Sequence, residues 1–417
     1  MLARRSHFCV FGRVLTLSFF SVAGPVFSEP VRISELLTLL AENPALQARD
    51  AAIESAIADS RAVESQGSPT LTADALTAVL GERNTAEPEY SMRAEQALYD
   101  WGINSNRIKG SRADIEAARL GRDQTLMDLS VSVSEAFHRL AIGRLQMQIL
   151  DDAQESLRGL GRMMSRRVEQ QVSPRVDLEI IQSQMALRDI QAETVRRDIG
   201  RQRLAILRDV KTLVDSVDLD ECSLEVEVDE QRWVSRAVSA SPQLSLFEAM
   251  ISGHIAEQAA IRSEAYPTII GGYQVDTDLD GENFDQRGYL ALRFELQLGS
   301  YLQARSAAER ARELEKRSLR IEKTETIAQQ TSDLIAEYET SRRMAVIQRK
   351  LADSRAIQRD SYLRRFVAGR ASWTDVLSAD KEVIEARVAE ASARVGACAA
   401  LSLLSITTGS ESPYAVD

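Results

Sequence analysis

The sequence predicts a mainly α-helical protein with a smaller β portion, and three observations lead to this fold class. Two long spans, 103–168 and 301–366, contain no proline, which would break a helix from within. Apolar residues in the first span recur at intervals of three and four, the pattern of helices that pack along a coiled-coil seam. Between residues 290 and 298 apolar and polar residues alternate, as in a strand with two unlike faces.

The length of these spans argues for an elongated shape. A helix of about 65 residues is on the order of 100 Å long, because each residue adds about 1.5 Å. The 417 residues would indicate several compact domains on length alone, but no compact domain holds two such helices. The chain also contains only 9 Pro and 5% aromatic residues, which is consistent with long helices. We therefore expect long antiparallel helical hairpins that form a tube or rod.

Landmark residues recur at a constant spacing, which indicates two copies of one unit. Pro44 and Pro242 are 198 positions apart, and the same spacing separates Asp177 from Asp375. Each predicted copy contains a helix, a pair of strands, a very long helix, a tight break and another long helix. The expected segments are a signal peptide at 1–28, a first structural repeat at 29–213, an inter-repeat linker at 214–229, a second repeat at 230–409 and a C-terminal tail at 410–417.

The first 28 residues have the features of a secretory signal peptide. Arg4, Arg5 and Arg13 give a positively charged start, and an apolar stretch follows. The cleavage site is expected near the end of this segment, and the sequence does not determine its exact position. A membrane anchor is the alternative, although Gly24 and Pro25 interrupt the stretch. Beyond residue 30 no run reaches the roughly 18 apolar residues of a membrane helix, which argues against a helical membrane protein.

Charge and motifs argue against an enzyme and against a nucleic-acid binder. The formal net charge is −11, whereas nucleic-acid binding needs a basic surface. No Ser-His-Asp order, Gly-rich phosphate loop or Cys-His cluster is present, so we predict neither a cofactor nor a metal site. His138 and His254 are expected to be surface or packing residues. Cys222 and Cys398 are expected to be two small buried residues, with a disulfide between them left open.

The predicted strands raise the question of assembly. They cover residues 71–80, 90–99, 269–276 and 290–298, and the last has about the length that crosses an outer membrane as a tilted strand. Strands this few cannot close a barrel, and an open sheet edge cannot lie in lipid. If they lie in a membrane, several chains must therefore share one barrel. The alternative is a soluble sheet that packs on helices.

Three motifs give the pattern a family resemblance. They are NPAL at residues 43–46, QALYDWG at 96–102, and FVAG at 366–369 followed by SWTDVL at 372–377. Each motif alone is weak, but their order, spacing and duplication along the chain are specific. Over essentially the whole mature chain, the sequence resembles the TolC family of outer-membrane efflux and secretion channels.

The resemblance implies both an architecture and a role. It implies a homotrimer with a shared twelve-strand barrel in the outer membrane and an α-helical tunnel in the periplasm. Such a protein is a passive exit duct that works with a periplasmic adaptor (membrane fusion) protein and an inner-membrane ABC or proton-driven transporter. No lipidation cysteine is evident, which favours type I protein secretion over drug efflux. The alternative is a periplasmic coiled-coil adaptor or scaffold without a pore.

The same resemblance points to a gate at the periplasmic helix tips. By motif match Asp375 is the gate aspartate of the second repeat, and Asp177 is its first-repeat equivalent. Family members often carry another aspartate one turn later, where this sequence has Ser378. Three copies of Asp375 around an axis would form an acidic ring that selects cations. Alternatively, both acids are solvated residues in the first turns of their helices, where the helix dipole favours them.

Two further groups of residues complete the predicted sites. Residues expected to restrain the gate or to make contacts at the tip are Arg365, Arg370, Arg175, Gly369, Phe366 and Val168. Residues expected to anchor the passage from strand to helix are Trp101, Gly102 and Gly299. Trp373, also at the tip, is expected either to pack in the turn or to meet a partner.

Overall fold

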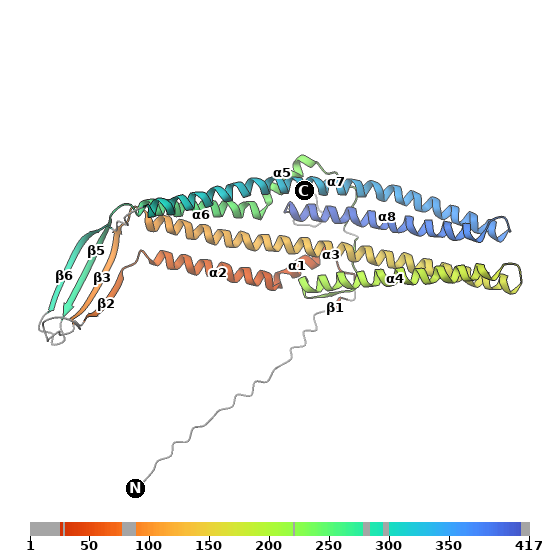
Figure 1. The fold of residues 1–417 in the computed structure, drawn as a ribbon, viewed down its shortest axis with the longest axis horizontal. Helices are drawn as coiled ribbons and strands as arrows, with labels where there is room; N and C mark the ends of the chain where they lie inside the picture. The colour runs from red at the N-terminus through yellow and green to blue at the C-terminus, as the bar shows by residue number, and fades with distance from the viewer. Residues whose placement is uncertain are drawn as a thin grey trace, which may run out of the picture.

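The computed structural model is an elongated body with a β-sheet at one end and two helical tips at the other (Figure 1). It describes residues 26–27, 30–76, 89–219, 222–277, 284–294 and 300–409. The predicted C-terminal tail and all but two residues of the predicted signal peptide lie outside the described residues. Those two, Val26–Phe27, form strand β1, which pairs in parallel with β4 (Leu213–Val214).

Both halves of the chain contain the same order of elements. The first half contains α1 (Ile33–Thr38), the 3₁₀ turn η1 (Leu39–Glu42), α2 (Pro44–Ser65), β2 (Thr70–Leu76), β3 (Glu89–Tyr99), α3 (Ile103–Glu169) and α4 (Arg175–Val210). The second half contains α5 (Glu230–Ala240), α6 (Pro242–Ser263), β5 (Thr268–Thr277), β6 (Phe284–Arg293), α7 (Tyr301–Val367) and α8 (Trp373–Thr407). The predicted fold class, long helical hairpins with a small β portion, is confirmed.

Local chemistry explains where the main helices begin. Pro44 and Pro242 occupy the first turns of α2 and α6, where the missing N–H of proline costs no hydrogen bond. Asn43 caps α2, because its side-chain oxygen accepts a hydrogen bond from the Ala45 N–H at 2.8 Å. Helices α3 and α7 contain 67 residues each, so each is about 100 Å long.

The elements lie side by side in one curved layer (Figure 1). In the sheet the order is β2-β3-β5-β6, with all neighbours antiparallel. The helices next to the sheet follow the same order, α2-α3-α6-α7, and those nearer the tips follow α4-α3-α8-α7. One lateral edge of the chain is therefore made by β6 and α7, and the other by β2, α2 and α4.

The sheet has one apolar and one polar face. Its register places Ile269 opposite Leu292 and Met92 opposite Val275 on one face, the apolar face. On the other face, the polar face, neighbouring strands align Arg93 with Gln274 and Arg287, and Glu95 with Gly272 and Tyr289. Leu290 and Leu292 on the apolar face are 76% and 72% exposed in the single chain. Among the described residues, nothing covers these two leucines of the apolar face.

One predicted strand differs from the observed one. The strand predicted at 290–298 begins earlier, at Phe284, and its described part ends at Arg293. The hairpin register sets this start, because Phe284 pairs with Thr277 at the end of β5. Residues 295–299 lie outside the described residues, as do residues 77–80 of the strand predicted at 71–80.

The main apolar core lies at the waist of the molecule, where α1, α3, α4, α7 and α8 meet. Phe137, Leu140 and Leu401 are fully buried there. The inter-repeat linker crosses this waist and is held by backbone contacts, since the Tyr338 hydroxyl donates to the Val226 carbonyl at 3.1 Å. The N-terminal segment joins it, because the Val31 N–H donates to the Ser216 carbonyl at 3.1 Å.

A disulfide fastens the linker to the core. Cys222 in the linker is bonded to Cys398 of α8, with their Cα atoms 5.8 Å apart. The question that the sequence left open is therefore answered, and against the expectation of two unbonded cysteines. Disulfides persist in oxidising compartments, which is consistent with export of the chain across the inner membrane.

Among the described helices, α8 has the length and composition to cross a membrane, with a mean hydropathy of 1.3 in its most apolar window. Half of that window is buried within the chain. The helix packs along α7 and α3, and it buries the polar residues Asp380, Ser402 and Ser405 in these contacts. These features are those of a core helix.

Candidate functional site

The two helical hairpins turn at the tips within a few residues of the predicted breaks. Pro174 is the N-cap of α4, and Gly369 follows α7 in the left-handed conformation with φ of 71°. The first hairpin instead uses Gln171 for this conformation, with φ of 58°. Glycine adopts positive φ without the steric cost that a side chain brings, so sequence reasoning could find Gly369 but not Gln171.

A small apolar cluster ties the two hairpins together at the tip. Phe366 of α7 and Trp373 of α8 are 6% and 3% exposed, and their ring centroids are 5.1 Å apart. They pack with Met164 of α3 and Ile181 of α4, and the half-buried Val168 lies against the same cluster. Of the two alternatives for Trp373, packing in the turn is what the single chain shows.

An arginine of α3 also joins the two hairpins. The guanidinium carbon of Arg167 on α3 lies 4.9 Å from the centre of the Phe366 ring on α7. Its Nε also donates to the Ser173 hydroxyl at 3.1 Å, in the first tip turn. A cation above an aromatic face is attracted to the ring, so Arg167 links the first hairpin to the second.

The predicted gate aspartate lies in the first turn of α8. Asp375 is exposed and forms a capping box with Ser372, in which the Asp375 N–H donates to the Ser372 hydroxyl at 3.2 Å. In return the Ser372 N–H donates to Asp375 Oδ2 at 3.0 Å. Asp177 is half-exposed in the first turn of α4, and Ser378 is exposed one turn after Asp375. In the single chain Asp375 therefore caps a helix.

The arginines expected to restrain the gate are not paired with it within one chain. Arg175 forms an ion pair with Glu179 of its own helix at 3.6 Å. Arg365 and Arg370 are exposed, and no ion pair joins either of them to Asp375 or Asp177 within the described part of the chain. A restraining role for them therefore stays a prediction about contacts between chains.

The passage from β3 to α3 is held by the residues around Trp101. Trp101 and Gly102 both have positive φ, at 55° and 88°. The indole N–H of Trp101 donates to the Pro267 carbonyl at 2.8 Å, and its ring lies 5.2 Å from that of Tyr266. These contacts tie the turn of the first half to the corresponding turn of the second. The third predicted anchor, Gly299, lies outside the described residues.

Sequence reasoning missed the residue that caps this turn. Asp100 accepts hydrogen bonds from the Gly102 N–H at 3.0 Å and from the Asn104 N–H at 2.7 Å. The first N–H groups of a helix have no partner inside the helix, and Asp100 supplies one for α3. An Asp just before a helical pattern is the available sequence signal.

The polar face of the sheet carries a connected group of side chains. Glu95 accepts hydrogen bonds from the Tyr289 hydroxyl at 2.5 Å and from Arg293 Nη2 at 2.6 Å. Tyr289 reaches Glu95 by lying across Gly272, where an added β-carbon would come within 2.3 Å of the ring. Gly272 is thus required for this arrangement, and three strands contribute to one charged patch.

The two described helix histidines differ in their surroundings. Burial in the waist core lowers the pKa of His138 to about 4, partly offset by its Nδ1–H, which donates to the Ser134 carbonyl at 2.7 Å. His254 instead contacts Glu309 of α7 through Nδ1 at 2.9 Å. No group of three or more His, Cys, Asp or Glu residues in the described part of the chain is arranged to hold a metal ion.

A family model described as "Outer membrane efflux protein" matches residues 36–208. Residues 36–208 are thus similar to the outer membrane efflux protein family. The resemblance inferred from the sequence motifs is thereby confirmed, together with a location in the outer membrane that extends into the periplasm. The family consists of passive conduits and not of enzymes.

Solved structures extend the likeness to the whole fold. A membrane protein from Pseudomonas aeruginosa superposes with a TM-score of 0.80 at 16% identity, covering 92% of this chain and 91% of that one. CusC superposes with a TM-score of 0.79 at 15% identity, with coverages of 94% and 96%. The outer membrane protein VceC from Vibrio cholerae gives a TM-score of 0.79 at 13% identity, with coverages of 91% and 96%. No curated protein sequence matches the chain.

Proposed function

We propose that three copies of this chain form a channel-tunnel, the exit duct of a tripartite export system. The observation that carries the proposal is the two-faced sheet with its two open edges. Its apolar face is exposed in the single chain, as a surface that meets lipid would be. Its polar face carries Arg293, Glu95 and Tyr289, as the inner wall of a water-filled barrel would.

The lateral order of the elements supports a closed ring. Edge strands leave backbone N–H and C=O groups unpaired, which lipid does not tolerate. The β6 edge of one chain can pair with the β2 edge of the next, while α7 meets α2 and α4 of that neighbour. Such a head-to-tail contact repeats until it closes a ring. Three chains with a four-stranded sheet each give the twelve-strand barrel of the proposal.

Exposed apolar residues on the edge helices support the same contact. On α7 they include Leu314, Ile321 and Ile357, and on α4 they include Leu187 and Ile190. Exposed apolar residues gathered on a surface mark sites of interaction. Here they lie on the two helices that form opposite lateral edges of the chain.

A passive duct does not supply the energy for transport itself, so it needs partner proteins that do. The partners we propose are a periplasmic adaptor (membrane fusion) protein and an inner-membrane transporter, either ABC or proton-driven. Among the possible cargoes we favour type I protein secretion, one of the two roles that the family resemblance implies. Drug efflux is the second possibility. A scaffold without a pore is not favoured, because it leaves the apolar face of the sheet unexplained.

Electron microscopy of the full chain purified in detergent tests this proposal. We expect a three-fold tube with a belt of detergent at one end, and a trimer in outer-membrane fractions that dissociates on heating. A monomeric rod without a detergent belt would contradict the trimeric duct. Co-purification with the product of a neighbouring adaptor gene, cross-linked at the tips, would decide between the partner classes.

We further propose that the tips are the gate, with Asp375 and Asp177 at the constriction. Replacing both by asparagine is expected to shift the channel from cation preference toward equal permeability, because the ring loses its negative charge. Asparagine keeps a side-chain oxygen that can accept from the Ser372 N–H, so the cap of α8 survives. Reversal potentials in planar bilayers under a KCl gradient measure the change.

The matched variant for this prediction adds charge at the same place. Ser378 is exposed one turn after Asp375, so Ser378→Asp should strengthen cation preference. If neither variant alters the reversal potential, the constriction does not lie at these residues.

A further inference from the structure

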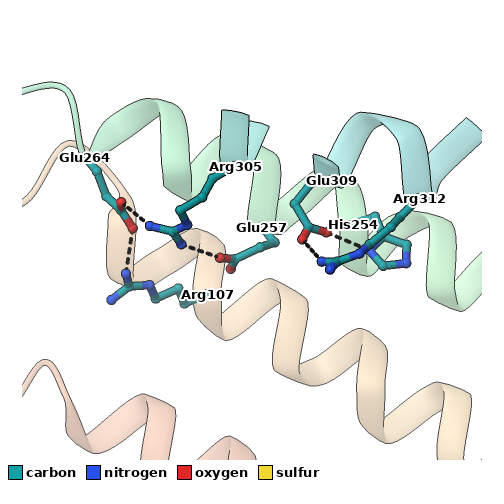
Figure 2. Close-up of polar contacts among 7 residues, drawn as sticks. All are labelled: Arg107, His254, Glu257, Glu264, Arg305, Glu309 and Arg312. Carbon is teal, nitrogen blue, oxygen red and sulfur yellow. Dashed lines mark hydrogen bonds and ion pairs between the residues drawn. The ribbon is translucent and has the colours of Figure 1, made fainter. Parts of the chain in front are cut away.

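Two kinds of contact tie the helices of one chain together. Near the sheet the ties are ion pairs, since Glu264 of α6 accepts from Arg107 of α3 at 2.8 Å and from Arg305 of α7 at 2.7 Å (Figure 2). At the waist the tie is the covalent bond between Cys222 and Cys398. Ion pairs form as soon as the helices meet, whereas a disulfide forms only when an oxidant takes electrons from both thiols. The bond at the waist therefore needs a reaction partner.

The number of cysteines limits what that partner has to do. The sequence contains three, and Cys9 lies in the predicted signal peptide, which leaves Cys222 and Cys398 in the expected mature chain. Two cysteines allow one bond within the chain, so no wrong bond has to be rearranged. The reaction partner is therefore an oxidant and not an isomerase.

Cys222 lies in a part of the linker whose side chains alternate between burial and exposure. Cys222, Leu224, Val226 and Val228 are partly buried against the waist core, and the residues between them are exposed. Helix α7 holds this part of the linker, because the Tyr338 hydroxyl donates to the Leu224 and Val226 carbonyls at 3.3 and 3.1 Å. These contacts bring Cys222 beside α8.

Cys398 lies deeper in the waist than Cys222. It is 3% exposed and belongs to the same buried cluster as Leu401 of its own helix and Tyr338 of α7. Thiol–disulfide exchange needs direct access of one sulfur to another. A protein-sized oxidant cannot reach Cys398 once the waist has packed, so the reaction must begin at the more accessible Cys222 or before the core closes.

The order of the chain favours the same cysteine. Cys222 precedes Cys398 by 176 positions. Because the predicted signal peptide is at the N-terminus, export starts there and Cys222 enters the periplasm first. At that stage α8, which carries Cys398, has not yet crossed the inner membrane. Cys222 thus meets an oxidant before it meets its bonding partner.

We propose that Cys222 is the entry cysteine for a periplasmic thiol oxidase and that Cys398 is the resolving cysteine. The oxidase is a protein with a reactive dithiol pair that acts in its disulfide form. The bond is made while the chain is being exported and before the waist core closes. This covalent modification does not depend on the proposed channel function.

The proposed reaction consists of two exchange steps. In the first, the Cys222 thiolate attacks one sulfur of the oxidase disulfide and bonds to it, and the other oxidase sulfur leaves as a thiolate. In the second, the Cys398 thiolate attacks Cys222 Sγ, forms the bond at the waist and expels the oxidase sulfur. The chain loses two electrons and two protons, and the oxidase, which gains them, leaves as a dithiol.

The test traps the intermediate of the first step in a bacterial host whose periplasmic thiol oxidase carries a tag. Cells that express the full chain are quenched with acid, free thiols are alkylated, and a non-reducing gel is probed for the chain and for the tag. Cys398→Ala lacks the resolving cysteine, so this variant should accumulate an adduct with the oxidase that dithiothreitol releases. Cys222→Ala is the matched control and should give several times less adduct. The comparison needs no folded variant, because the adduct forms before the waist packs.

A second measurement follows wild type in hosts that lack one enzyme. Without the oxidase, both thiols should stay free and react with a maleimide added after denaturation, whereas loss of a periplasmic disulfide isomerase should change nothing. Equal adducts in the two single-cysteine variants overturn the proposed order. A bond that forms as fast without the oxidase overturns the need for the partner. A chain that forms its bond as proposed but does not conduct contradicts only the channel proposal, so the two failures are distinguishable.

Discussion

Removing the disulfide through Cys222→Ala and Cys398→Ala is expected to lower the free energy of unfolding by about 2–5 kcal/mol. The bond joins residues 176 positions apart, and a cross-link that closes so long a loop removes much of the entropy of the unfolded chain. Its loss also frees the linker from α8. We expect a clearly lower temperature for the loss of helical circular dichroism, measured at one scan rate.

Reduction of the wild-type protein provides the control for this prediction. Dithiothreitol should lower the unfolding temperature of wild type to that of the double variant and should leave the double variant unchanged. The tips are far from the waist (Figure 1), so conductance of the variant at low temperature should match wild type. Equal unfolding temperatures with and without the bond would mean that packing alone holds the linker.

The structural reason for so large an effect is that the linker spans both helices of the second hairpin. The Tyr338 hydroxyl and Arg342 Nη1 of α7 both donate to the Val226 carbonyl, at 3.1 and 3.3 Å, while Cys222 is bonded to α8. The linker therefore holds α7 and α8 together at the waist. Without the bond, the linker keeps its contacts with α7, its apolar packing and the hydrogen bonds that join it to the N-terminal segment, but it loses its covalent tie to α8.

The long helices could be predicted because a single residue type decides them. The absence of proline over 103–168 and 301–366 leaves α3 and α7 uninterrupted, and Pro44 and Pro242 begin the helices that precede the strands. The tip turns were predictable for the same reason, since Pro174 precedes α4 as its N-cap and Gly369 follows the end of α7. These features depend on local backbone geometry, which a sequence contains directly.

Contacts between distant residues could not be predicted in this way. Cys222 pairs with Cys398, Arg167 covers Phe366, and His254 meets Glu309 only because particular helix faces meet. A helical pattern identifies an apolar face but not the face it packs against. The start of β6 at Phe284 has the same origin, because the pairing with β5 sets it rather than the alternation within the strand.

Asp375, the proposed gate aspartate, shows how one residue can fit two sequence patterns. The sequence Ser372-x-x-Asp375 is a capping-box pattern, and the structure forms both of its hydrogen bonds. The family motif assigns the same aspartate to a gate, which concerns contacts between chains. The two roles are compatible, since the cap uses Oδ2 and fixes the carboxylate at the very end of the tip.

Placing arginine on the apolar face of the sheet, as Leu290→Arg with Leu292→Arg, is expected to prevent assembly in the outer membrane. A charged residue on the lipid face near the bilayer midplane costs about 2–4 kcal/mol, and a trimer would contain the pair three times. Both leucines are more than two-thirds exposed in the single chain, so the change removes little packing within it. The heat-dissociable trimer in outer-membrane fractions is the measurement.

The same substitution on the polar face makes the control. Gln274 lies on that face, between Arg93 of β3 and Arg287 of β6. Gln274→Arg adds one positive charge per chain to the same sheet, against two in the leucine variant, and it should leave the trimer intact and alter ion selectivity instead. Unaltered membrane assembly of the leucine variant would mean that the apolar face does not meet lipid. Loss of the trimer in both variants would mean that the sheet does not tolerate added charge on either side. The comparison of the two faces tests whether the apolar face meets lipid. Hydropathy averaged over the strand cannot test this, because it is the same for a lipid-facing and a soluble sheet.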